Sequence, residues 1–159
     1  MSISRIQWVE IVGVISVVFS LLFVAYQIQQ ANQIAVVSNE LDIRENFASI
    51  NEILMTDRAF ASLLNKSTDP NYAATAEEQE QLRGLVLRMM NVWMAAETAY
   101  VNGMLPEESF TTIFNDVDAV FGRYPSMRKL FRNSLDNYPG WNTTDVYGYM
   151  DKQLKSQGF

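Results

Sequence analysis

Apolar side chains run without a charge over residues 11–26, where nothing is more polar than two serines and a tyrosine. A helix of that length rises about 24 Å, slightly less than the roughly 30 Å hydrocarbon core of a bilayer. Trp8 and Tyr26 lie about 27 Å apart along such a helix, a spacing that suits two aromatic side chains at opposite membrane interfaces. Residues 1–30 are therefore predicted to form an N-terminal tail and one transmembrane helix.

Two other interpretations compete with a membrane span. A cleaved signal peptide needs a small-x-small site directly after the apolar run, and "YQIQQANQIAVV" offers none. The core helix of a soluble bundle is the second alternative, but such bundles rarely begin with a long uncharged segment at the extreme N-terminus. The pattern favours the span over both alternatives.

The apolar pattern becomes periodic beyond the span. Amide side chains come first, at the level of the lipid headgroups: Gln27, Gln29, Gln30, Asn32 and Gln33. Apolar residues then recur at intervals of three and four, in two sets: Ile34, Val37 and Leu41, then Ile43, Phe47, Ile50 and Leu54. Neither Gly nor Pro occurs between Val14 and Thr68, so nothing in the chain forces the helix to stop after the membrane. We expect one long helix whose outer part is amphipathic and packs against a partner.

Start and stop signals divide the rest of the chain into shorter helices. Thr75 and Glu78 form a capping box, Gly103 stands at a helix stop, and Pro106 stands in the first turn of the next helix. "PGWN" predicts a turn, and Gly148 is expected to interrupt the last helix. The predicted helices cover residues 57–66, 75–102, 106–122, 126–138 and 143–156.

These elements define an all-α fold class, since no strand-like alternation competes with them. The transmembrane helix is predicted to continue into a long amphipathic helix, followed by a small bundle of about four further helices. Residues 31–159 would form the soluble α-helical domain. Residues 84–101 are also apolar nearly all round, but a charge deep in a span costs at least about 2.5 kcal/mol on insertion scales, and Arg88 and Glu97 lie within this stretch. A central buried helix explains it better.

A stripe of small or weakly polar side chains lies along one side of the predicted span. Four residues fall within roughly 60° of one another around a helix: Gly13, Ser16, Ser20 and Gln27. Small residues let helices approach closely in lipid, and hydroxyls or amides can bond across the contact. The stripe predicts association between spans, although isolated Ser and Gly residues are also tolerated in single spans.

Composition removes several classes of chemistry. The chain has no Cys and no His, which excludes thiol chemistry, disulfides, the usual zinc sites and imidazole catalysis. A net charge of −6 argues against nucleic acid as a partner. No cofactor and no metal site are predicted. Glu97 is the one ionisable group placed near the core, where a carboxylate paired with an arginine or capped by Tyr or Asn donors is favoured over an acid–base group.

One basic run stands against the acidic background, in "RYPSMRKLFR". Its cations could meet an acidic partner, an anionic headgroup or the protein's own carboxylates, and the last of these is favoured. They are Arg123, Arg128, Lys129 and Arg132.

Three stretches resemble a family of uncharacterised bacterial membrane-anchored helical proteins: "LLFVAYQIQQANQIA", "INEILMTDRAFASLLNK" and "EEQEQLRGLVLRMMNVWMAAETAYVNGMLPEESF". The resemblance covers most of the chain, and its motifs are structural. Trp93, Glu97, Tyr100 and Gly103 match packing and turn positions, so it implies a fold and a membrane anchor and no catalytic residue.

The sequence thus predicts a single-pass protein of the bacterial inner membrane that works by binding and is not an enzyme. Its expected partners are the lipid bilayer and either copies of itself or another membrane protein. The alternative is a homo-oligomeric membrane pore or sensor whose spans pack through the stripe. Arg5 precedes the span and the next cation after it is Arg44, which predicts a cytoplasmic N-terminus and a periplasmic helical domain.

Overall fold

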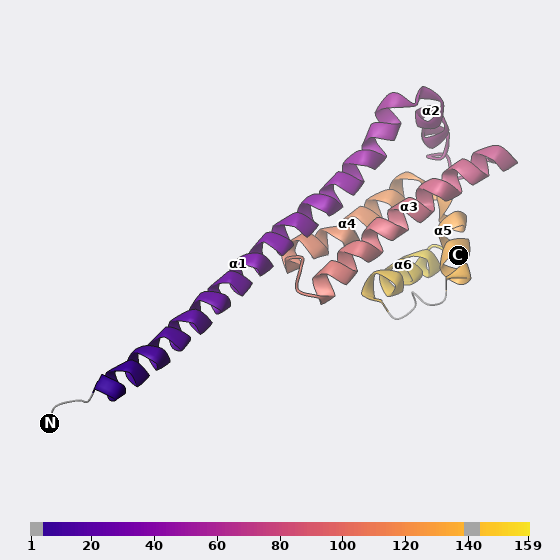
Figure 1. Ribbon diagram of the computed structural model, residues 1–159. Coiled ribbons are helices and arrows are strands. Elements are labelled where there is room, and N and C mark those ends of the chain that lie inside the picture. The colour runs from indigo at the N-terminus through magenta and orange to yellow at the C-terminus, as the bar shows by residue number, and fades with distance from the viewer. Residues whose placement is uncertain (1–4, 139–143) are drawn as a thin grey trace.

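The computed structural model describes residues 5–138 and 144–159. Within these ranges all regular structure is helical, and the first helix, α1, runs without a break through Arg5–Thr56. In Figure 1 it extends far beyond the other helices, which all lie beside its C-terminal half. The all-α fold class and the continuation of the apolar segment into a long amphipathic helix are confirmed.

The N-terminal half of α1 stands clear of the rest of the molecule (Figure 1). Every described side chain from Trp8 to Ile34 is exposed, so this segment is not the core helix of a soluble bundle. It is also the one helix among the described residues that is long and apolar enough to cross a membrane, with a mean hydropathy of 2.4 over 18 residues. Because α1 is continuous, the predicted boundary at residue 30 marks a change in the composition of one helix and not a break between two folded units.

The C-terminal half of α1 packs onto the bundle through α2 and α3. Ile50 is buried, while Ile43, Phe47 and Leu54 are half-buried against the same core. These four residues lie on one side of the helix, as their spacing predicted. Burial of this side is what fixes α1 to the domain.

Helix α2, Arg58–Lys66, begins where Asp57 accepts a hydrogen bond from the backbone N–H of Phe60 at 2.9 Å. A side-chain oxygen at this position satisfies one of the free N–H groups of the first turn. Beyond the helix, buried Ser67 accepts a hydrogen bond at its carbonyl from the Ser126 hydroxyl at 2.9 Å. The end of α2 is thereby joined to a segment far along the chain.

Helix α3, Ala76–Val101, is the centre of the domain and contacts each of the other five α-helices. The predicted capping box is present: Thr75 and Glu78 each accept a hydrogen bond from the other's backbone N–H. This N–H bond from Thr75, followed by the nearby Tyr72 and Lys66 side chains, lowers the pKa of Glu78 to about 2. At the other end Gly103 adopts a φ of 69°, a conformation that favours glycine and reverses the chain.

The remaining helices close the bundle around α3. They are α4, Glu107–Arg123; a short 3₁₀ turn, η1, Pro125–Met127; α5, Arg128–Asn137; and α6, Asp145–Ser156. Trp93 is fully buried and stacks on Phe131 with ring centroids 5.8 Å apart, and Phe131 packs against Phe121 at 4.8 Å. Large aromatic side chains from three helices therefore meet at one point of the core.

One helix prediction was wrong in detail. Helix α6 continues through Gly148, where the sequence predicted an interruption. Glycine costs about 1 kcal/mol in a helix interior, but Val146, Met150 and Leu154 are buried on one face and their packing outweighs that cost. The predicted turn "PGWN", residues 139–142, lies outside the described residues.

Candidate interaction surfaces

The first candidate surface is the exposed apolar side of α1 between the predicted span and the bundle. Ile34, Val37 and Leu41 are 63%, 57% and 59% exposed, and we call these three residues the outer face. On an α-helix they lie about 140° around the axis from the residues that pack onto the bundle. The sequence predicted both sets as packed against a partner, whereas in this structure only the second set is covered.

The predicted association stripe, formed by Gly13, Ser16, Ser20 and Gln27, lies on the clear part of α1. A Cβ atom added at Gly13 would meet no other atom within 4 Å, so a neighbouring helix could approach closely there. The two serine hydroxyls already donate within their own helix, Ser16 to the carbonyl of Val12 at 2.8 Å and Ser20 to the carbonyl of Ser16 at 2.9 Å. Small size is therefore a better basis for association here than hydroxyl donors directed at a partner.

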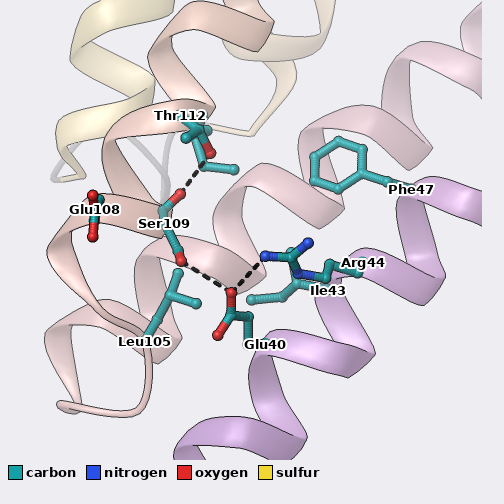
Figure 2. Close-up of a pocket in the computed structure, with 9 residues that line it drawn as sticks. Glu40, Ile43, Arg44, Phe47, Leu105, Glu108, Ser109 and Thr112 are labelled. Carbon is teal, nitrogen blue, oxygen red and sulfur yellow. Dashed lines mark hydrogen bonds and ion pairs between the residues drawn. The ribbon is translucent and has the colours of Figure 1, made fainter.

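A groove between α1 and the start of α4 forms a second candidate surface. Figure 2 shows the Glu40 carboxylate between Arg44 of the same helix and the Ser109 hydroxyl of α4, which donate to it at 2.8 and 3.2 Å. The hydrogen bond from Arg44, followed by that from Ser109, lowers the pKa of Glu40. The groove has a volume of about 540 Å³, and its apolar lining consists of Ile43, Phe47, Leu105 and Ile113.

Two of the three charged side chains that line the groove are paired with each other. Arg44 balances Glu40, and the remaining charged residue of the lining is Glu108, whose side chain is exposed. Sequence analysis missed this site because Glu40 and Ser109 are 69 positions apart and neither belongs to a recognisable motif.

The basic run is spread over several structural roles. Arg128 donates two hydrogen bonds to the carbonyl of Phe121, at 3.0 and 2.8 Å, and so caps the end of α4. Arg132 pairs with Asp136 and Asp151, and both carboxylates raise its pKa. Two of the four cations thus bond to groups of the protein itself.

The other two cations of the run are exposed. The Arg123 guanidinium lies 5.7 Å from the ring centroid of Tyr124, and Lys129 stands on the first turn of α5. In Figure 1, α5 lies on the side of the bundle away from the N-terminal half of α1. This position does not bring the run to the level of the predicted span.

Glu97 is buried and caps another helix. Its two oxygens accept hydrogen bonds from the backbone N–H groups of Asp145 and Val146, at 2.6 and 3.1 Å. Thr144 accepts a third bond from the N–H of Tyr147, so three free donors at the start of α6 are satisfied. Glu97 therefore joins α3 to α6, and its two oxygens are occupied by these bonds.

Asp116 is a second partly buried carboxylate, and sequence analysis did not single it out. It accepts a hydrogen bond from the indole N–H of Trp93 at 2.6 Å. Burial raises the pKa of Asp116, and the Trp93 bond opposes that shift. Among the described residues no group of three or more His, Cys, Asp or Glu side chains is placed to hold a metal ion.

Comparison of the chain with protein-family models, with curated proteins and with solved structures finds no match. The resemblance to bacterial membrane-anchored helical proteins stays a prediction from the sequence motifs.

Proposed function

We propose that this protein is a single-pass membrane-anchored interaction or scaffold protein that binds copies of itself or another membrane component. The observation that carries the proposal is residues 11–26 of α1, which are mostly apolar, contain no charge and are exposed on all sides. Large apolar surfaces that remain exposed on a folded chain mark contact with a membrane or with other proteins.

The apolar part of that helix supports a membrane anchor. Transfer of apolar surface out of water is worth about 25 cal/mol per Å². The Val, Ile, Leu and Phe side chains of this segment are exposed on every turn of the helix, so their burial in a bilayer would be strongly favourable. A bilayer covers all sides of a helix at once, which one protein partner does not.

We propose a non-enzymatic role because the groups that could do chemistry have structural partners. The sequence has no His and no Cys. Glu97 is occupied as a helix cap, and Asp116 accepts a bond from Trp93. The α1–α4 groove presents Glu40 already neutralised by Arg44. None of these arrangements combines a nucleophile with a base or with an oxyanion site.

A homo-oligomeric pore or sensor is the alternative function. A pore needs polar groups turned toward its lumen, whereas the hydroxyls of Ser16 and Ser20 donate to carbonyls of their own helix. Close packing of small residues requires no free donors. These bonds favour the scaffold over the pore.

The proposed location is the bacterial inner membrane, with the N-terminus in the cytoplasm and the helical domain in the periplasm. The support is the charge bias of the sequence, in which Arg5 precedes the span and Arg44 is the first cation beyond it.

The native mass of the chain in lipid nanodiscs tests the proposal most directly. For a chain of 18.1 kDa, we expect the protein mass per disc to be a multiple of that value and to fall as the protein is diluted into excess lipid. One copy per disc at every dilution would contradict self-association and leave another membrane component as the required partner.

A further inference from the structure

We propose that a second copy of this chain pairs with α1 in parallel, along one continuous seam that runs from inside the span to the edge of the bundle. This inference rests on the proposed function and names the surface that performs it. The seam residues are Gly13, Ser16, Ser20, Phe23, Gln27, Gln30, Ile34, Val37 and Leu41.

The seam has the spacing of a coiled coil. The association stripe and the outer face fall on one series of positions that alternate by three and four residues from Gly13 to Leu41, and Phe23 and Gln30 complete its four heptads. The association stripe and the outer face, which were defined separately, are therefore two parts of one pattern. A repeat of seven residues keeps the same side of two helices in contact when they coil around each other.

The seam is open to a partner along its full length. All of its residues are exposed, because the domain packs against the opposite side of α1. In Figure 1 the bundle lies along one side of α1 only. A second helix laid on the seam would therefore meet neither α3 nor α4.

The segment between the span and the bundle gives a reason to expect a covering helix. Residues 11–39 contain no Asp, Glu, Lys or Arg. A lone helix in water is usually supported by charged pairs three or four residues apart, and short unsupported helices are marginal. The first such pair along the described part of the chain is Glu40 with Arg44, at the end of the seam. Covering Ile34, Val37 and Leu41 would supply the missing support.

The chemistry of the seam fits a second copy better than an unrelated helix. A glutamine amide carries both donors and an acceptor, so Gln27 and Gln30 can each bond to the same residue of a parallel copy. Copies inserted in one membrane share one orientation, which brings identical residues face to face. A standard interface buries about 800 Å² per partner, so each of the nine seam positions would have to bury about 90 Å² together with its neighbours.

Disulfide cross-linking in membranes tests the seam, because the chain contains no cysteine of its own. Single cysteines would be placed at four seam positions by Gln30→Cys, Ile34→Cys, Val37→Cys and Leu41→Cys. Matched controls on the opposite side of the helix, all exposed in the structure, are Ala25→Cys, Gln29→Cys and Asn32→Cys. A disulfide requires Cβ atoms about 3.5 to 4.5 Å apart, so its formation between two identical positions reports a parallel, in-register contact.

We expect high yields of cross-linked dimer at the seam positions and yields at least about fivefold lower at the controls. The high yields should repeat every seven residues, at positions 30 and 37 and at positions 34 and 41. Equal yields at all seven positions, or a maximum on the control side, would overturn the seam. The mass of protein per nanodisc separates failure of the seam from failure of the proposed scaffold function. Several copies per disc without seam cross-links would leave the scaffold function standing and remove this interface, whereas one copy per disc would remove self-association itself.

A charge variant gives a second readout that does not depend on oxidation. In the Gln30→Cys background, Val37→Glu should lower the cross-linking yield by about fivefold or more, because it buries a carboxylate beside its own copy. Asn32→Glu adds the same charge on the opposite side and should leave the yield unchanged. Equal losses in both variants would also overturn the seam.

Discussion

At the scale of single residues, the buried carboxylates hold helices together. Glu97 of α3 caps the start of α6 by accepting hydrogen bonds from two of its backbone N–H groups. Asp116 of α4 accepts a hydrogen bond from the indole N–H of buried Trp93. In both pairs a polar group that would otherwise lose its hydrogen bond to water finds a partner on another helix. The bonds therefore fix how helices α4 and α6 are placed on α3.

Substitutions at Glu97 should destabilise the domain according to how many acceptor oxygens they remove. Glu97→Ala leaves two N–H groups of α6 without an acceptor and should lower the free energy of unfolding by about 2 to 4 kcal/mol. Glu97→Gln keeps one acceptor oxygen and should lose about half of that. Chemical denaturation of the full chain in detergent, followed by circular dichroism, measures both. Glu52→Gln, on an exposed position of α1, serves as the control; equal stability of the Glu97→Ala variant and this control would contradict the cap.

Asp116 should give the domain a stability that depends on pH. Because burial raises its pKa in the folded chain, its favourable contribution is present below its ordinary pKa of 3.8 and is lost as the pH rises through the higher folded value. Asp116→Asn keeps an acceptor for Trp93 and removes the buried charge. We expect it to stabilise the chain at pH 7 by about 1 kcal/mol or less and to have no effect below pH 3.8.

Thermal unfolding of parent and variant at pH 3.5 and pH 7 measures the difference. A stabilisation of the same size at both values would show that the Asp116 charge is not its cause. The assay needs no correction for histidine titration, since the chain has none.

The sequence predicted the place of Glu97 but not its partners. An ionisable residue on an otherwise apolar helix must be held by hydrogen bonds, which is a local argument. Its donors are backbone groups 48 and 49 positions away, and only the packing of α6 on α3 brings them there. Asp116 was missed for the same reason, because its partner Trp93 lies on another helix.

At the scale of helices, local sequence signals predicted most helix boundaries. They did not predict that the apolar side of α1 changes direction along the helix. The capping box at Thr75 and the helix stop at Gly103 stand where the sequence placed them, and Gly103 has a positive φ. Along α1, however, the apolar spacing changes from four residues to two between Leu41 and Ile43, which turns the apolar side by about 160°. That single short step separates the outer face from the face that packs on the bundle.

Bulky substitutions within the span test whether association depends on which side of the helix carries the bulk or on the hydrophobicity of the span. Gly13→Leu with Ser20→Leu fills the small positions of the seam and should abolish close approach, although both changes make the span more apolar. Val14→Leu with Val18→Leu adds bulk on the opposite side and should leave association intact. One interhelical hydrogen bond in lipid is worth only about 0.6 to 2 kcal/mol, so a single substitution would only shift the equilibrium and the double variant is the sharper test.

Mass in nanodiscs across a dilution series measures both double variants. If the Gly13→Leu and Ser20→Leu variant keeps the parent's distribution of copies per disc, the small residues of the span are incidental. The seam would then depend on Ile34, Val37 and Leu41 outside the membrane.

At the scale of the whole molecule, the proposed membrane arrangement puts a length of α1 between the lipid surface and the domain. Glu40, where α4 first bonds to α1 through Ser109, lies fourteen residues beyond Tyr26, or about 21 Å along the helix. The sequence predicted a span followed by a helical bundle, but the length of helix between them depends on where the domain packs, which is a tertiary property. A domain held at that distance leaves the intervening segment of α1 accessible to a second copy.

The side of the membrane on which the domain stands is the last prediction. Arg5 precedes the span, and the 38 positions between Arg5 and Arg44 hold no Lys or Arg. Cations flanking a span are retained on the cytoplasmic side, which places the N-terminus in the cytoplasm and the domain in the periplasm. Alkaline phosphatase fused after Phe159 should therefore be active, because it folds only outside the cytoplasm. An inactive phosphatase together with a fluorescent cytoplasmic reporter at the same position would reverse the orientation, while the parallel seam would hold equally on either side.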